Sequence, residues 1–419
     1  MIMEELIMEK NIKLSENIFW VGKVDDREVP FHRLTLTKGT TYNSYLLMAE
    51  KPTVIDTVDL SFGKEFVDNL KSIIELDKIK YIVINHTEPD HSGALGGLAA
   101  KAKNAIIVCT KLAVIELKEM YKLYDREFLI VGDGDTLDIG GKTLNFIETP
   151  YLHTAETMIT YCLEDKILFP CDIFSTHVAN YDYFNDMAKE DITADYIGYY
   201  KLIMHPHRRY VQNMINKIKD LDIQIIAPSH GYILRENVQS FIDIYDNMSK
   251  NTAINKKALI IYSTMTGRTK KIATFIMEKF LEQNIDSETI DINKVDKEEV
   301  IKAINEADVI MFGSSTKYAD MIGNMEDILK ELHALNLENK IGVAFGSYGW
   351  SGEAIEVVQD YLNQSNIKVL STSDVIKSTG MIDIEFPIRI RFAPEENNLK
   401  SIERAVIYTV DLLLGIDPK

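Results

Sequence analysis

Residues 79–91 join a buried strand to four potential metal ligands, and this combination limits the fold more than any other stretch of the chain. The run 79–84 is apolar and β-branched, which predicts a short buried strand. Pro89 then predicts a loop at the carboxyl end of that strand, with a helix starting near residues 92–94. Two imidazoles and two carboxylates this close together favour a metal site over a solvated turn. These candidate ligands are His86, Glu88, Asp90 and His91.

Three later segments are predicted to be strands that end in the same way. They cover residues 143–147, 166–169 and 223–226, and they lead to His153, Asp172 and His230. Ligands of one site come from distant segments, and loops at one edge of a sheet bring such segments together. Alone, each of these histidines would be read as a hydrogen-bonded loop residue. As a set, the seven residues predict a shared metal centre.

The ligand inventory is too large for a single tetrahedral zinc ion. Four imidazoles and three carboxylates suit two ions, with one carboxylate placed to bridge them. Oxygen donors beside imidazoles favour iron or manganese. The other histidines have no matching context. His205 and His207 lie beside Arg208 and Arg209 and predict a basic surface patch, while His32 and His177 are left as candidates for the pocket lining.

The second half of the chain begins after a polar linker at residues 247–257, which predicts two domains, 1–254 and 255–419. A buried strand at 258–262 leads into a hydroxyl-rich loop and then a helix whose apolar residues share one face. Hydroxyls and free N–H groups at a helix N-terminus predict an anion site. The loop is neither a Walker A motif nor GxGxxG. Its candidate residues are Ser263, Thr264, Met265, Thr266, Gly267, Arg268 and Thr269.

Two more predicted strands, 309–313 and 341–346, end in similar loops. Strands that alternate with helices predict a doubly wound parallel sheet, whose ligands bind beyond the carboxyl ends of the strands. The three loops offer a phosphate cradle and aromatic faces for a flat ring. Tyr348 and Trp350 could be core residues, but their glycine neighbours favour a cofactor cover. The further candidates are Ser315, Thr316, Lys317 and Tyr318, then Ser347, Tyr348, Gly349, Trp350, Ser351 and Gly352.

Composition narrows the classes of partner and compartment. A net charge of −18 argues against nucleic-acid binding. The three cysteines include no CxxC pair, which excludes a disulfide framework and a built-in four-cysteine iron site and suits a reducing compartment. The first residues are acidic rather than signal-like, and no apolar run reaches the roughly 18 residues of a membrane span. These features predict a cytoplasmic protein without a membrane partner.

The ligand pattern His-x-Glu-x-Asp-His, followed by a single His, an Asp and Ser-His-Gly, resembles the metallo-β-lactamase-like fold. The zinc hydrolases of that fold usually carry His where Glu88 stands. The version with Glu resembles the flavodiiron proteins (A-type flavoproteins), as do segments 39–46 and 227–231. The second half resembles flavodoxin, and segment 345–352 is similar to the third flavin loop of flavodiiron proteins. The expected fold class is α/β, with a metallo-β-lactamase-like αββα sandwich followed by a flavodoxin-like doubly wound parallel sheet.

The resemblance implies an oxidoreductase that reduces O2 to water, NO to N2O, or both. It implies FMN and two iron ions, all seven residues as ligands, and Asp172 as the bridge. It also implies a separate electron donor, which is rubredoxin, a flavin reductase or reduced F420 in the family, and a head-to-tail homodimer or homotetramer. Arg389 and Arg391 could steer an acidic carrier, although a solvated charged face is the favoured interpretation.

The sequence departs from the family pattern at two places, and two other functions stay open. Residues 154–158 replace Trp-Pro-Asp-Ser-Met, and residues 173–177 stand where Gly-Gln is frequent. Both changes are expected to alter the residues behind the ligands and to leave the choice between O2 and NO undecided. One alternative is a binuclear zinc hydrolase fused to a flavodoxin electron carrier, which Glu88 argues against. The other is an electron carrier with a docking scaffold, which the complete ligand set argues against.

Overall fold

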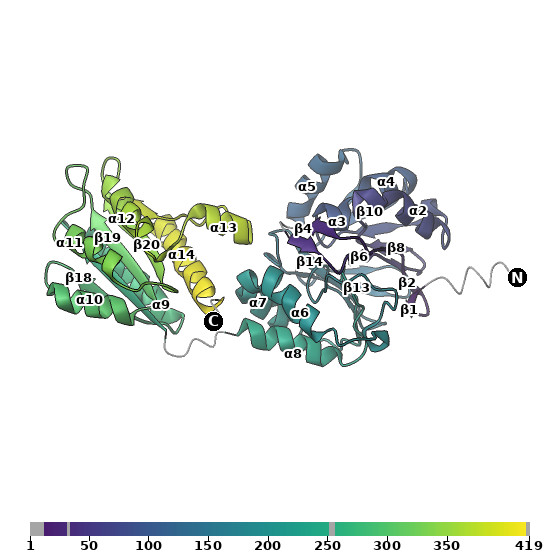
Figure 1. The fold of residues 1–419 in the computed structure, drawn as a ribbon. Helices are drawn as coiled ribbons and strands as arrows, with labels where there is room; N and C mark the ends of the chain where they lie inside the picture. Colours follow the sequence, from purple (N-terminus) through teal and green to yellow (C-terminus); the bar gives the residue numbers. More distant parts are fainter. Residues whose placement is uncertain (1–11, 32–33, 251–255, 416–419) are drawn as a thin grey trace, which may run out of the picture. The chain divides into compact units, whose positions relative to one another are not determined.

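The computed structural model describes residues 12–31, 34–250 and 256–415, which fall into two compact units (Figure 1). The first unit spans residues 1–250 and the second 251–419. The boundary predicted between residues 254 and 255 lies outside the described residues.

The first unit contains two β-sheets. One has seven strands in the order β1 (Lys13–Ser15), β2 (Ile18–Trp20), β7 (Tyr45–Leu47), β8 (Thr53–Ile55), β9 (Tyr81–Val83), β10 (Ile106–Cys109) and β11 (Phe128–Ile130). The other has five, β12 (Thr136–Asp138), β13 (Thr143–Glu148), β14 (Met158–Cys162), β15 (Ile167–Phe169) and β16 (Ile225–Ile226). Two small ribbons pair β3 (Lys23–Asp25) with β6 (Thr40–Tyr42), and β4 (Val29–Phe31) with β5 (Leu34–Leu36).

Helices cover the outer face of each sheet, so the first unit is an αββα sandwich (Figure 1). Strand β9 is buried on both faces. Ile82 packs in the cluster under the helices, while Tyr81 and Val83 pack in the cluster between the sheets. A strand buried on both faces must be apolar along its length, which explains the continuous run in the sequence. The covering helices are α2 (Gly63–Lys71), α4 (Leu95–Lys101) and α5 (Lys111–Tyr121) on one side, and α6 (Thr193–Tyr199), α7 (Arg208–Ile218) and α8 (Val238–Ser249) on the other.

The second unit is a parallel sheet with helices on both faces. Its order is β18 (Asp286–Asp291), β17 (Lys257–Ser263), β19 (Val309–Ser315), β20 (Ile341–Tyr348) and β21 (Lys368–Val369), with β22 (Ile388–Arg391) also paired to β20. This is the flavodoxin-like order. One face carries α9 (Arg268–Glu282), α13 (Thr372–Thr379) and α14 (Glu396–Gly415), and the other α10 (Lys297–Glu306), α11 (Met325–Glu331) and α12 (Glu353–Asn363). The α9 residues predicted to share a face, Ile272, Ile276 and Phe280, are all fully buried.

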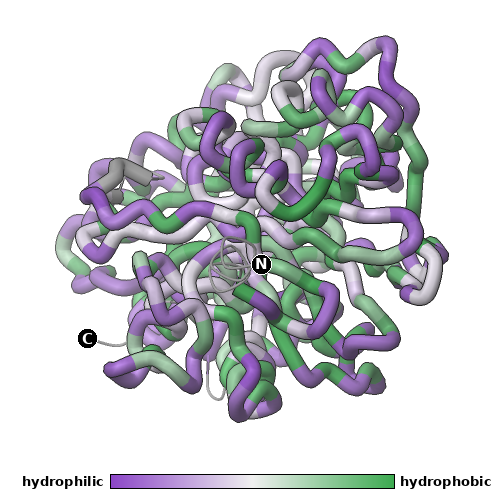
Figure 2. Tube along the Cα trace, turned by 90° about the vertical axis from the view of Figure 1, so that its right-hand side faces the viewer, coloured by the Kyte–Doolittle hydropathy of each residue, from purple (hydrophilic) through white to green (hydrophobic). Residues whose placement is uncertain are grey.

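The expected fold class is therefore confirmed for both halves of the chain. Figure 2 shows hydrophilic and hydrophobic stretches alternating along the trace. None of the helices in the described residues has the length and apolar character that crossing a membrane requires.

Candidate metal centre

The seven predicted ligands converge, and they come from two sheets rather than from one. His86 and Glu88 follow β9 of the seven-stranded sheet, and the short helix α3 (Pro89–Ser92) carries Asp90 and His91. The remaining three follow β13, β15 and β16 of the five-stranded sheet. The loop predicted after β9 covers residues 84–88, but a helix begins at Pro89, earlier than expected; proline occupies the first turn of α3, where its missing N–H costs nothing.

Four of the side chains surround one point. The ligand atoms of His86, Glu88, His153 and Asp172 all lie within 4.8 Å of one another. Glu88 Oε2 is 3.5 Å from His86 Nε2 and 3.4 Å from His153 Nε2. Asp172 Oδ2 is 3.5 Å from His86 Nε2 and 3.3 Å from His153 Nε2. These atoms define a first donor group with two imidazoles and two carboxylates.

A second donor group, Asp90, His91 and His230, shares Asp172 with the first. Asp90 Oδ2 lies 3.5 Å from His91 Nε2 and 3.2 Å from His230 Nε2. Asp172 reaches the same histidines, with Oδ2 at 3.3 Å from His91 Nε2 and Oδ1 at 3.3 Å from His230 Nε2. Asp172 thus contacts histidines of both groups, which is the position predicted for the bridging carboxylate.

The spacing of these atoms fits two cations better than a set of hydrogen bonds. Ligands at about 2.1 Å from one ion lie about 3.0 to 3.4 Å apart, close to the distances above. Among the described residues, several of the facing atoms are buried and have no hydrogen-bond partner; they are His86 Nε2, Asp90 Oδ2, His91 Nε2 and Asp172 Oδ2. Such a set of imidazoles and carboxylates is a fit for a pair of iron or manganese ions.

Two ligand histidines are oriented by acceptors behind them. His86 Nδ1 donates to Glu156 Oε1 at 2.8 Å, and His230 Nδ1 donates to the backbone carbonyl of Thr41 at 2.6 Å. Each bond places the proton on Nδ1 and turns Nε2 toward the centre. The expectation that residues 154–158 alter the residues behind the ligands is only partly correct, because Glu156 supplies a carboxylate at the position of the family aspartate.

The two segments that carried the family resemblance are bonded to each other. Asn43 Nδ2 and the Tyr45 hydroxyl both donate to the carbonyl of Pro228, at 2.9 and 2.7 Å. The backbone N–H of Gly231 donates to Thr41 Oγ1 at 2.7 Å. Segment 39–46 therefore fixes the loop that presents His230, which is a structural reason for both motifs to occur in one chain.

Sequence reasoning missed Tyr199, whose hydroxyl donates to Asp172 Oδ1 at 2.9 Å. The side chain is buried on α6 beside two other tyrosines, a pattern that indicates only core packing. His177, a candidate for the lining, has its ring 4.9 Å from the rings of both Tyr199 and His230 and lines the centre. His32 lies outside the described residues.

The basic stretch at residues 205–209 is not the surface patch that the sequence predicted. His207 is only 2% exposed and Arg208 only 4%. Burial lowers the pKa of His207 to about 3. Arg208 is buried because α7 is amphipathic, and the buried face of this helix begins at Arg208 and continues through Val211 and Met214.

We expect metal loading to release protons and to strengthen as the pH rises. Burial lowers the pKa of His153 and His230, but the carboxylates that face them, Asp172 with Glu88 or Asp90, outweigh it and raise the values to about 9 and about 10. These pKa values exceed the unfolded value near 6.5, so in the metal-free protein the stabilisation is complete below about pH 6.5 and is lost as the pH rises through 9 to 10. A metal ion must displace those protons.

Calorimetric titration of Fe(II) into metal-free protein, in buffers of different ionisation enthalpy, measures this release. At least two protons should leave per loaded chain at pH 8, and the number should fall as the pH approaches 10. Release that did not vary over this range would contradict the assignment.

In the second unit, the three predicted cofactor loops meet at the carboxyl ends of β17, β19 and β20. The Thr269 hydroxyl lies 2.8 Å from those of Ser315 and Ser347, so one residue from each loop is joined. Among the described residues, Thr316 Oγ1 is a buried atom without a hydrogen-bond partner. Tyr318 and Trp350 are 90% and 93% exposed. Hydroxyls at a helix N-terminus beside exposed aromatic faces fit a phosphate and a flat ring.

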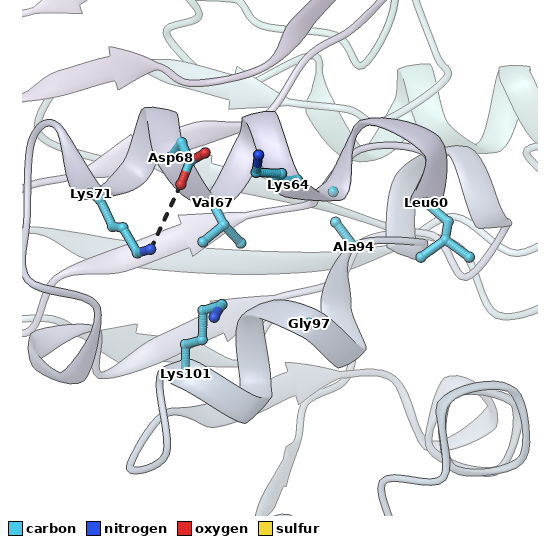
Figure 3. Close-up of a pocket in the computed structure, with 9 residues that line it drawn as sticks. Leu60, Lys64, Val67, Asp68, Lys71, Ala94, Gly97 and Lys101 are labelled. Carbon is cyan, nitrogen blue, oxygen red and sulfur yellow. Dashed lines mark ion pairs between the residues drawn. The ribbon is translucent and has the colours of Figure 1, made fainter.

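A separate hollow of about 380 Å³ lies between α2 and α4 (Figure 3). Its charged lining is Lys64, Lys71, Lys101 and Asp68. Lys71 pairs with Asp68 at 3.7 Å. None of the seven predicted ligands lines it, so this hollow is distinct from the metal centre.

Comparison with known proteins matches both units. Residues 40–231 match a family described as ODP family beta lactamase, and residues 260–404 match flavodoxin. The nitric oxide reductase of Moorella thermoacetica is 32% identical over 369 residues, which cover 87% of this chain and 92% of that protein.

Two solved structures extend the similarity over nearly the whole chain. The flavodiiron protein from Giardia intestinalis is 27% identical with a TM-score of 0.58, covering 97% of this chain and 98% of that one. The rubredoxin oxygen:oxidoreductase of Desulfovibrio gigas is 26% identical with a TM-score of 0.57, covering 96% and 98%.

Proposed function

This chain belongs to the flavodiiron protein family, and on that premise we propose that it is an oxidoreductase that reduces O2 to water, NO to N2O, or both, at a pair of iron ions supplied with electrons through FMN. Relatives bear the names nitric oxide reductase and rubredoxin oxygen:oxidoreductase. Both substrates stay within the proposal, because the seven donor residues suit either.

The observation that carries the proposal is the shared position of Asp172. Its two oxygens contact histidines of both donor groups, three of them at 3.3 Å. A carboxylate so placed can hold two cations a short distance apart. Glu88 supports iron over the two-zinc hydrolase alternative, since it puts an oxygen donor where the hydrolases of this fold usually have an imidazole.

When bound, the iron pair would supply the coordination and electron chemistry, and FMN the electron pairs. The chain's own residues would bind the two ions, orient the ligand side chains and shield the centre from solvent. The imidazoles of His86, His91 and His230 are buried, so these three donor residues are shielded from bulk water. The Tyr199 hydroxyl donates a hydrogen bond to Asp172 Oδ1, which fixes the rotation of the carboxylate shared by both groups. Burial foremost raises the pKa of Tyr199, so its hydroxyl keeps that proton at neutral pH.

For FMN we propose that the three strand-end loops divide the work. Hydroxyls and N–H groups of residues 263–269 would hold the phosphate at the start of α9. Residues 315–318 and 347–352 would enclose the ring, with Tyr348 and Trp350 as its aromatic cover.

We propose a separate electron donor of the rubredoxin, flavin reductase or F420 type, and a head-to-tail homodimer or homotetramer in which one chain's flavin serves the other chain's metals. A unit of this size is about 35 to 40 Å across, too far for fast transfer within one chain if the sites lie at opposite ends. Sedimentation of the active protein tests the assembly, and a fully active monomer would contradict it. The three cysteines are buried free thiols, which suits the reducing cytoplasm that we propose as its location.

The deciding experiment is anaerobic reconstitution with iron and FMN, followed by quantification of each per chain. We expect about two iron ions, from the two donor groups, and one FMN. The reduced protein should then consume O2 or NO, and the relative rates assign the substrate. Iron-depleted protein that consumed either gas at the full rate would exclude the proposal, and bound zinc with hydrolytic turnover would favour the alternative.

A further inference from the structure

The fifth strand position of the second sheet is occupied by two short strands. β21 pairs only with the start of β20, at Ile341 and Gly342, whereas β22 pairs only with its end, from Phe345 to Tyr348. The backbone N–H of Phe392 continues this pairing with a 2.7 Å bond to the carbonyl of Tyr348. β22, with the sequence Ile-Arg-Ile-Arg, therefore lies beside the aromatic loop (residues 348–352); its two isoleucines are buried in the core, and its two arginines contact the loop.

Arg389 of β22 contacts the aromatic loop and the helix after it in several ways. Its Nη2 donates to the carbonyl of Ser351 at 2.6 Å, and its Nη1 pairs with Glu356 on α12. The guanidinium carbon lies 5.6 Å from the centroid of the Tyr348 ring. The arginine interpreted from the sequence as a solvated charge is in fact bonded to the loop.

Gly352 explains how the loop packs so closely on Arg389. Its φ is +78°, and a Cβ there would lie 3.0 Å from Tyr348 Cγ and 3.3 Å from Arg389 Nη2. Glycine tolerates both this conformation and this proximity. The turn before α12 therefore packs directly against the guanidinium group of Arg389.

Arg391, two residues along the same strand, makes much weaker contacts. Its Nε reaches the carbonyl of Gly349 at 3.4 Å, and its guanidinium lies over the Phe392 ring at 5.0 Å. No ion pair of Arg391 occurs among the residues that the structure describes. It has the same charge and nearly the same location as Arg389, which makes it a matched control.

We propose that Arg389 is a positioning residue for FMN: it holds the aromatic loop in the shape that presents Tyr348 and Trp350 to the flavin ring. This inference rests on the proposed function. Trp350 is 93% exposed, so its packing alone does not fix the loop. Preorganising a loop spares the binding energy that ordering it would otherwise consume.

The geometry also requires arginine in particular. The carbonyl of Ser351, the carboxylate of Glu356 and the face of Tyr348 are met by different parts of one planar group. A lysine ammonium is a compact charge that cannot serve all three at once. Arg389→Lys keeps the positive charge but loses the planar guanidinium group with its several N–H donors. This variant therefore separates positioning of the loop from simple electrostatics.

The test compares FMN binding to apoprotein by flavin fluorescence titration, together with the midpoint potential of the bound flavin. We expect Arg389→Gln to weaken FMN binding about tenfold, equal to about 1.4 kcal/mol, with Arg389→Lys close to it and Arg391→Gln within about twofold of the parent protein. The potential should change in Arg389→Gln and Arg389→Lys alike, because both release the loop, and not in Arg391→Gln.

The outcomes are distinct. Parent-like FMN binding by Arg389→Gln, or full rescue by Arg389→Lys, would overturn the positioning role. Equal weakening of FMN binding by Arg391→Gln would show that local positive charge alone explains the effect. That result would also overturn the positioning role of Arg389. Failure of the parent protein itself to bind FMN would instead refute the proposed function.

Discussion

Asp172→Asn is expected to lower metal affinity about 10² to 4 × 10³-fold at both donor groups, because removing one member of a buried charged set costs about 3 to 5 kcal/mol. An amide cannot present anionic oxygen to His91, His153 and His230 together. Its NH2 group would also face at least one ring nitrogen that needs an acceptor or a metal. Iron per chain should fall well below two, and gas reduction should fall with it, as measured by metal analysis and anaerobic turnover.

Asp165→Asn is the matched control for this change. Asp165 lies in the turn between β14 and β15 and is partly buried, whereas Asp172 is fully buried; it accepts hydrogen bonds from Ser15 and Lys142, away from the centre. That variant should keep full iron content even if it is less stable. Retention of two iron ions by Asp172→Asn would show that the two groups bind independently, against the bridging assignment.

Much of the fold was predictable because local and tertiary preferences agree in this chain. β9 is apolar on both faces since it lies between helices and a second sheet, and α9 places three apolar residues on one face of a long helix. Such patterns depend on burial alone. The convergence of the seven candidate ligands was predictable for a related reason, because four strand ends each led to a residue type that binds metals.

The residues that were missed depend on contacts between distant segments. His207 precedes two arginines, yet it is buried where α7 begins. Tyr199 resembles any core tyrosine until α6 packs its hydroxyl against Asp172. Pro89 reads equally as a breaker or as the first residue of a helix. In each case the local sequence permits two structures, and packing chooses between them.

Glu156→Ala should lower metal affinity and gas reduction about 10 to 100-fold, the usual effect of removing a partner of a ligating histidine. One oxygen, Oε1, accepts from His86 Nδ1 at 2.8 Å and from the backbone N–H and hydroxyl of Thr87 at 3.1 and 2.9 Å. Burial raises the pKa of Glu156, but the hydrogen bond from His86 and others outweigh it and keep the carboxylate ionised. Without it, the His86 ring loses its fixed tautomer and orientation.

Glu156→Gln separates the charge of this group from its shape. An amide oxygen can still accept the hydrogen bond from His86. If orientation of the ring dominates, Glu156→Gln should lose less iron affinity than Glu156→Ala. If the negative charge dominates, the two variants should lose the same affinity. Glu116→Gln is the control, since Glu116 lies 2.6 Å from the same Thr87 hydroxyl but is an exposed residue on α5. Competition with a chelator should show the highest iron affinity in Glu116→Gln. Glu156→Gln should bind iron more weakly, and Glu156→Ala should bind it no more tightly than Glu156→Gln does. Unchanged affinity in Glu156→Ala would mean that the loop after β9 alone orients His86, and that the carboxylate retained at this position has no part in the metal centre.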